Sequence, residues 1–291
     1  MKRLLIQLSL FALIITSCEL YEQDEYREKY FVESYLVEGE PLPRIRLTTT
    51  ASFDTEYIPS ENYVTGANVL VHLLDDNDER VATYVYREPS NIGVYVTYRN
   101  EVIVQSERTY ELEITFPDSD DTISARTTVP GEFELLSSGK DTLLYQSSEQ
   151  FTATYSASYY PGRQSYYIFA TRALDPENYS LTPFWKMADN EQSSLTLINS
   201  GIINEDNYQV DDQELILRFP WLGIAYYGPN EIITYAIDDN IYDFYRSQSV
   251  QLGGSTLSPG EIPNIIYNIE GGIGLFGSMA GAKVRVFVDE P

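Results

Sequence analysis

The segment VLVHLLDDNDERVATYVY, residues 69–86, decides the fold. Its two outer runs, 69–74 and 81–86, are rich in Val, Leu and Tyr, and the polar cluster 75–79 separates them. Two β-rich runs around a short polar cluster predict a β-hairpin with its tip at 75–79. Clustered carboxylates also attract Ca²⁺, but this loop lacks the Gly and the distant Glu of a helix–loop–helix site. A bound Ca²⁺ here, or in the acidic loop at 118–121, is left open.

Outward from the hairpin, the same pattern continues on both sides. Further strands are expected at 93–98, 109–114 and 123–129. Short strands with turn residues between them favour an Ig-like or transthyretin-like β-sandwich over residues 29–130. Val129-Pro130-Gly131 is the expected boundary, since Pro and Gly interrupt regular structure.

Residues 131–291 are expected to form a second β-rich domain with one or two short helices. Its strands are predicted at 151–155, 165–170, 215–219, 232–237 and 284–288. Asp238 or Asp239 can cap a helix that places Ile241, Phe244 and Tyr245 on one face. The fold class is therefore mostly β.

The first residues predict export and lipid anchoring. Lys2 and Arg3 precede the apolar stretch 4–15, which fits a signal peptide but is too short to span a bilayer. Residues 15–18, Ile-Thr-Ser-Cys, resemble the lipobox of bacterial lipoproteins, so residues 1–17 are expected to be removed and Cys18 to carry the lipid. Cys18 is the only cysteine, and an unpaired cysteine in an exported chain needs such an explanation. A plain secretory signal with an incidental cysteine is the alternative.

Residues 18–28 are expected to form an acidic tether after the lipid. Glu22, Asp24 and Glu25 in it resemble the export tag that sends Bacteroidota lipoproteins to the cell surface. The alternative is a solvated linker without a sorting role. We expect a lipid-anchored protein of the outer membrane, exposed at the cell surface.

The charge of the chain argues against two classes of partner. Removing residues 1–17 takes away Lys2 and Arg3 and no acidic residue, so the net charge moves from −25 to −27. Phosphate binding requires clustered Lys and Arg, and anionic lipid attracts basic segments. We therefore expect no nucleic-acid partner and contact with the membrane through the lipid alone.

Five further segments resemble a Bacteroidota lipoprotein family known as domain of unknown function 4249. They are 30–39, 45–50, 64–69, 93–95 and 263–277, and the last, which contains Asn-Ile-Glu-Gly-Gly-Ile-Gly-Leu-Phe-Gly, is the most specific. The resemblance covers nearly the whole mature chain. It implies an outer-membrane protein often encoded beside TonB-dependent receptors, with an N-terminal sandwich like the regulatory module of carboxypeptidases. No catalytic residues are established for that family.

Neither a catalytic nor a cofactor motif is found. Residues 272–277 have the Gly-x-Gly-x-x-Gly spacing, but only fourteen residues follow, too few for a βαβ unit and its acidic partner. These glycines are expected to let the backbone turn or approach a neighbouring chain closely. His72, the only histidine, is expected to be a half-buried strand residue, because no serine has the nucleophile-elbow pattern and catalytic zinc uses several His or Cys ligands. We expect no enzyme, cofactor or metal.

Aromatic residues are the best candidates for binding. Trp185, Trp221 and Tyr227 are chosen because Trp and Tyr are enriched at interface hot spots, and the segments around Trp221 and Tyr227 look exposed. Packing in the core is the alternative for all of them. The leading hypothesis is a non-catalytic surface lipoprotein that is accessory to a TonB-dependent β-barrel receptor or its cargo. The first alternative is an independent binder of glycan or peptide; the second is a hydrolase with paired carboxylates.

Overall fold

The computed structural model describes residues 26–52, 54–161, 165–187, 195–204, 209–211, 214–249, 251 and 264–291. Within these ranges the chain is mostly β, and the expected fold class, with sandwich-like domains and short helices, is confirmed. Cys18, Glu22, Asp24 and Glu25 lie outside the described residues. In the part of the chain that the structure describes, no helix is long and apolar enough to cross a membrane.

The first sandwich packs a four-stranded sheet against one end of a larger sheet. The small sheet has the order β4-β3-β6-β7. Its strands are β3 (Asn68–Leu74), β4 (Arg80–Tyr86), β6 (Thr109–Phe116) and β7 (Ser119–Thr128). The facing strands are β1 (Tyr30–Val37), β2 (Ile45–Thr49) and β5 (Val94–Tyr95), and the short 3-10 helix η2 (Pro59–Glu61) lies in the β2–β3 connection. Alternate residues of both layers, such as Leu47 and Leu112, share one buried core.

The second sandwich repeats this layering with later strands. One layer has the order β14-β15-β10-β8, and the other contains β12, β11, β16 and β17, with β13 paired to β11 and β9 paired to β17. The bounds are β8 (Leu135–Ser138), β9 (Thr142–Leu144), β10 (Thr152–Ser156), β11 (Tyr166–Ala173), β12 (Leu197–Asn199), β13 (Ile203–Asn204), β14 (Gln209–Asp211), β15 (Glu214–Arg218), β16 (Gly228–Ile237) and β17 (Ile273–Asp289). Phe169 and Leu217 lie in the core between these layers.

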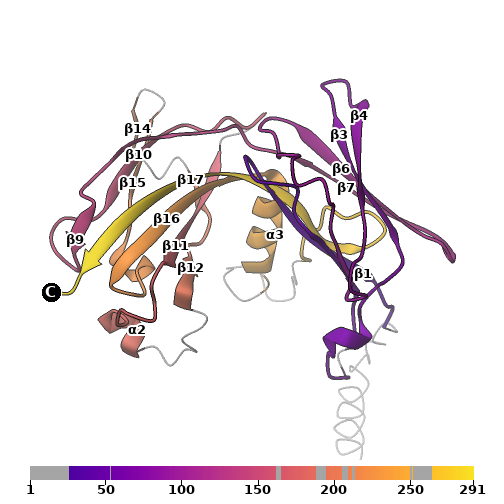
Figure 1. Cartoon of the computed structure of the whole chain (residues 1–291), viewed down its shortest axis with the longest axis horizontal. Coiled ribbons are helices and arrows are strands. Elements are labelled where there is room, and N and C mark those ends of the chain that lie inside the picture. Colours follow the sequence, from indigo (N-terminus) through magenta and orange to yellow (C-terminus); the bar gives the residue numbers. More distant parts are fainter. Residues whose placement is uncertain are drawn as a thin grey trace, which may run out of the picture.

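The long strand β17 joins the two sandwiches. Its first half pairs in parallel with β1, and its second half pairs antiparallel with β16. Figure 1 shows β17 running through the middle of one arched sheet that serves both sandwiches. Ile269 and Phe276 belong to the core of the first sandwich, so the C-terminal segment completes the N-terminal half. The boundary at 129–131 stays a prediction.

The predicted glycine role in β17 is confirmed at Gly274. This residue has φ +116°, and a Cβ there would lie 2.0 Å from the carbonyl oxygen of Val32. Only glycine lets the backbone of β17 approach β1 this closely. The parallel pairing of the two strands therefore depends on the glycine at position 274, which lies in the segment 263–277.

The predicted helix after Asp238 is α3 (Asp239–Ser249). The carboxylate of Asp238 accepts a hydrogen bond from the Ile241 N–H at 2.9 Å, as a helix N-cap does. Ile241 is buried against Ile237 and Leu275, whereas Tyr245 is exposed. In Figure 1, α3 lies within the concave side of the arch. Two shorter helical segments, α2 (Pro183–Met187) and the 3-10 helix η5 (Trp221–Gly223), lie beside the second sandwich.

The hairpin of residues 69–86 forms as predicted. The Asp75 carboxylate closes its tip by accepting the N–H groups of Asn77 and Glu79, both at 2.9 Å. These backbone hydrogen bonds lower the pKa of Asp75. The strand expected at 93–98 is reduced to β5, because the chain turns after Val96, where the Arg99 N–H bonds to the Thr97 hydroxyl at 3.3 Å.

Candidate functional site

The most concentrated charge on the first sandwich surrounds Glu111 on the outer face of the β4-β3-β6-β7 sheet. Strand register places Glu111 opposite His72 of β3 and Arg126 of β7. The Glu111 side chain is 11% exposed and accepts from Arg80 Nε at 3.0 Å and from Arg126 Nε at 2.8 Å. Burial alone would raise the pKa of Glu111, but hydrogen bonds from both arginines outweigh it, and the pKa falls below its usual value.

His72 lies beside this pair and is fully buried, at 2% exposure, instead of half-buried as predicted. Its Nδ1 is 2.9 Å from the Thr83 hydroxyl, and its Nε2 is 3.6 Å from a Glu113 carboxylate oxygen. Burial and the nearby Arg80 lower the pKa of His72, so the ring is a weak proton acceptor. Arg80 also donates to Glu113 at 2.7 Å. Thr83, His72 and Glu113 therefore lie in the order hydroxyl, imidazole, carboxylate, as in a catalytic triad. The Glu113 carboxylate, however, is bound by Arg80.

The same residues have the spacing of a metal site. One ligand atom each from His72, Glu111 and Glu113 lies within 4.8 Å of the others. The guanidinium of Arg80 bonds to both carboxylates and already supplies the positive charge that a cation would bring. A metal ion would have to displace Arg80, so the geometry favours an arginine-held carboxylate pair over a metal centre.

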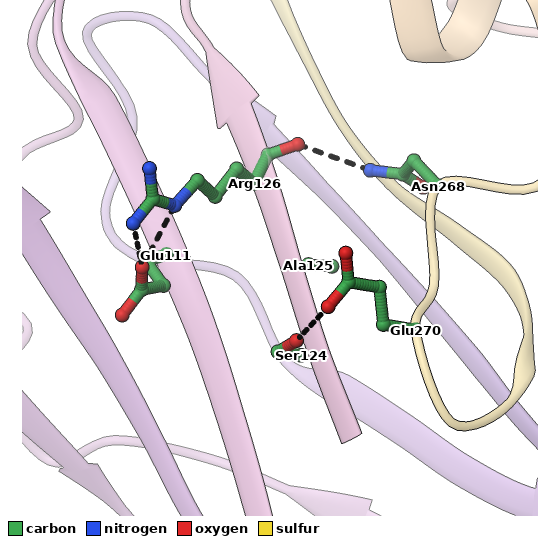
Figure 2. A pocket seen from close by; sticks show the side chains of 6 residues that line it. All are labelled: Glu111, Ser124, Ala125, Arg126, Asn268 and Glu270. Carbon is green, nitrogen blue, oxygen red and sulfur yellow. Dashed lines mark hydrogen bonds and ion pairs between the residues drawn. The ribbon is translucent and has the colours of Figure 1, made fainter.

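A polar pocket of about 490 Å³ opens next to Glu111, where the segment 264–270 runs beside β7. Figure 2 shows its lining, with the Asn268 side chain pointing to the Arg126 backbone and Glu270 pointing to Ser124. Asn268 Nδ2 donates to the Arg126 carbonyl at 3.1 Å, and the Ser124 hydroxyl donates to Glu270 at 3.0 Å. Backbone bonds in both directions also join Ser124 and Glu270, at 3.1 and 2.8 Å. The segment thus covers the edge of β7 with its own polar groups.

The three aromatic candidates fall in one region, but they differ in exposure. Tyr227 is 5% exposed and belongs to the core of the second sandwich. Its expected exposure is wrong, because the ring packs edge-on against Tyr145 with centroids 5.5 Å apart. Trp221 is partly buried against the same Tyr145 at 5.4 Å. Trp185 in α2 is partly buried, and its Nε1 donates to the Leu222 carbonyl at 3.0 Å.

Trp185 helps to line an apolar pocket of about 290 Å³ between α2, η5, β11 and β12. Phe169 and Phe219 form part of the lining, and Phe184 and Leu222 stand at the rim with 42% and 54% exposure. The Thr182 N–H and hydroxyl hold the start of α2 against the chain of η5, with bonds to Ala225 and Ile224 of 2.8 and 2.9 Å. We call this pocket, together with the exposed side chains of Phe184 and Leu222 at its rim, the aromatic pocket.

More exposed apolar side chains lie close to the aromatic pocket in the sequence. Met187 at the end of α2 is 80% exposed, and Leu197 of β12 is 41% exposed. Exposed apolar side chains that gather at one place, as Phe184 and Leu222 do at the rim of this pocket, are typical of an interaction site. Phe184 and Leu222 were not among the predicted binding residues, although each directly neighbours a predicted tryptophan, because only Trp and Tyr were considered as anchors.

The fold and these surfaces define a mostly β protein of two joined sandwiches with an apolar surface pocket. The chain belongs to the family described as Domain of unknown function (DUF4249), whose model matches residues 16–285. No curated protein matches the sequence.

Solved structures to which the chain is similar include α-2-macroglobulins. Trypsin-activated α-2-macroglobulin from Escherichia coli and the methylamine-reacted Salmonella protein each share 11% identity over 90% of this chain, with a TM-score of 0.23. A tetra-tandem repeat of a large adhesion protein also shares 11% identity, over 89% of this chain, with a TM-score of 0.23. The chain spans 16%, 15% and 48% of those three chains. TM-scores this low carry no inference about function.

Proposed function

We propose that this chain is a non-catalytic lipoprotein of the outer-membrane surface, anchored through Cys18, that binds a TonB-dependent receptor or its cargo. The observation that carries the binding role is the aromatic pocket with its exposed rim. The anchoring and the receptor rest on the lipobox at 15–18, the acidic tether and the family resemblance.

The character of the aromatic pocket supports a protein partner. The hydrogen bond from Trp185 to Leu222 fixes the indole, so the pocket is formed before a partner arrives. Phe184 and Leu222 would then contact an apolar side chain of that partner. Pre-formed apolar pockets of this kind accept the anchor residues that dominate protein interfaces.

The independent glycan binder receives less support from the same region. Stacking on a sugar needs the open face of an aromatic ring, and Tyr227 lies in the core. Trp221 packs against Tyr145 and is only partly accessible. The hydrolase is disfavoured by Arg80, which ties up Glu113 beside the only histidine.

The binding role can be tested by affinity capture of the full-length lipoprotein from detergent-extracted native outer membranes, followed by mass spectrometry. We expect a stoichiometric β-barrel receptor with the wild-type protein. Phe184→Asp should lose it, because removing one apolar anchor costs about 2 kcal/mol, or about 30-fold in affinity. Leu136→Asp is the matched control, since Leu136 is 49% exposed on β8 of the same sandwich.

The outcomes separate the alternatives. Recovery of the wild-type lipoprotein alone contradicts the accessory role and directs the search to glycan and peptide arrays. Retention of the receptor by Phe184→Asp contradicts the aromatic pocket as the contact. Cys18→Ser tests the anchor separately: acyl chains supply about 0.8 kcal/mol per buried CH₂, so the variant should move from the membrane to the soluble fraction. A variant that stays in the membrane fraction would refute lipidation at Cys18.

A further inference from the structure

The two edges of the β4-β3-β6-β7 sheet are treated differently by the fold. The β7 edge is covered by the segment that contains Asn268 and Glu270, as Figure 2 shows. At the opposite edge, β4 pairs with β3 on one side only. Figure 1 shows the β3–β4 hairpin projecting at one end of the molecule. An uncovered edge strand is a template for pairing with another extended chain.

Strand alternation shows which backbone groups of β4 face outward. Arg87, just past the strand, exchanges both backbone hydrogen bonds with Val96, at 2.8 and 2.9 Å. The backbone N–H and C=O groups of Arg87 therefore point away from β3. Because alternate residues of an antiparallel strand bond to opposite sides, Thr83 and Val85 direct their N–H and C=O groups to the open edge. Within the described ranges of the chain, these groups have no backbone partner.

The side chains of this edge also lack the usual protection. Between Arg80 and Arg87 the sequence VATYVY has no charge and no proline. Val81 and Val85 are 55% and 56% exposed on the outer face. Natural edge strands are normally blunted by charge, proline or a covering segment. The open edge of β4 therefore has both unpaired backbone groups and apolar side chains.

We propose that β4 binds an extended segment of a partner protein, which adds to the sheet as a further strand. The unpaired groups of Thr83 and Val85 recognise an extended backbone, and the two valines favour apolar residues at alternate positions of the segment. The acidic turn 75–79 at one end of β4 favours Lys or Arg at that end of the segment. At the other end Arg87 offsets Glu88, whose carboxylate already accepts the N–H groups of Gly66 and Gly93. This edge belongs to the first sandwich, so it is independent of the aromatic pocket.

A synthetic peptide can stand in for the partner segment. The probe is fluorescein-labelled Lys-Thr-Val-Thr-Val-Thr-Val-Lys, titrated against the full-length lipidated chain in detergent and followed by fluorescence anisotropy. We expect saturable binding with a Kd of about 1 mM or tighter. Two further peptides, one with Glu at both ends and one with a central Pro, should bind more weakly.

Thr83→Pro is the decisive variant, because proline removes the outward N–H and leaves the bonds to β3 in place. It should weaken binding about ten-fold, whereas Thr83→Val, the matched control with the same backbone, should bind within about two-fold of wild type. Equal binding by Thr83→Pro and wild type would overturn the proposal. So would the absence of saturable binding at peptide concentrations of several millimolar.

Amide hydrogen exchange on the wild-type chain keeps the test valid even if Thr83→Pro does not fold. On adding the peptide, exchange at Thr83 and Val85 should slow, and exchange at Tyr84, which bonds to β3, should not change. Peptide binding without this pattern contradicts pairing at β4. Sedimentation without peptide tests whether a second copy of the chain pairs with β4 instead. A dimer that Thr83→Pro dissociates would show that it does and would overturn the assignment to a partner protein.

Discussion

Replacing Asp238 with asparagine should change how the stability of this protein depends on pH. Asp238 caps α3 and has no exposed surface. Its carboxylate also accepts hydrogen bonds from the Thr127 hydroxyl of β7 and from Asn240 Nδ2, the latter at 3.0 Å. The Ser278 hydroxyl of β17 lies 3.5 Å away. The group therefore links the first sandwich, the helix and the strand that joins the two halves.

Burial raises the pKa of Asp238 to about 7 from an ordinary value of 3.8, although its hydrogen bonds act in the opposite direction. Between these values the folded protein holds a proton that the unfolded chain has lost. The stabilisation is complete below pH 3.8, decreases as the pH rises, and is lost above about pH 7. A shift of this size corresponds to about 4 kcal/mol.

The measurement is urea unfolding of wild type and Asp238→Asn from pH 4.5 to 8 at constant ionic strength, followed by circular dichroism. Asparagine cannot ionise and still caps a helix. The unfolding free energy of wild type minus that of the variant should therefore fall by about 3 kcal/mol across this range, because the rest of the effect is lost below pH 4.5. Asp239→Asn removes a charge at the exposed neighbouring position and shows how much of the effect comes from charge alone. A flat difference for Asp238→Asn would refute the reasoning and would mean that the hydrogen bonds outweigh burial.

Local patterns were sufficient to predict many of the elements. The hairpin at 69–86 follows from two apolar runs and an acidic turn, and its tip depends on Asp75 bonding to residues two and four positions further on. The start of α3 follows from Asp238 and the buried Ile241 three residues later. Both signals lie within a few residues of the structure that they specify.

Features that depend on distant residues were not predicted. The strand at 284–288 was expected, but β17 begins at Ile273, and its first half pairs in parallel with β1, where Phe31 lies opposite Ile273. Nothing local in either segment specifies a partner so far along the chain. Tyr227 shows the same limit: a Gly-Pro pair follows it and suggests an exposed loop, but Tyr145, far away in the sequence, covers its ring.

The charged site could not be predicted for the same reason. Glu111, Arg80 and Arg126 come from three strands and meet only through the register of the sheet. A one-residue slip in register would move each side chain to the opposite face. Composition alone gave abundant carboxylates without indicating which of them would be paired.

Two further substitutions test the joint between the halves and the charged site. Gly274→Ala should destabilise the chain by about 3 kcal/mol, because a Cβ would lie 2.0 Å from the Val32 oxygen; urea unfolding measures this, and Gly201→Ala, in open space, is the control. Glu111→Gln leaves two guanidinium groups without their shared carboxylate. Loss of a fully buried partner costs about 3–5 kcal/mol, but the two arginine side chains are 47% and 53% exposed, so water compensates in part and we expect about 2 kcal/mol. Glu101→Gln, in an exposed ion pair, should leave the unfolding free energy unchanged. Equal effects of the two glutamate substitutions would show that the contacts of Glu111 with Arg80 and Arg126 stabilise the sheet no more than an exposed ion pair does.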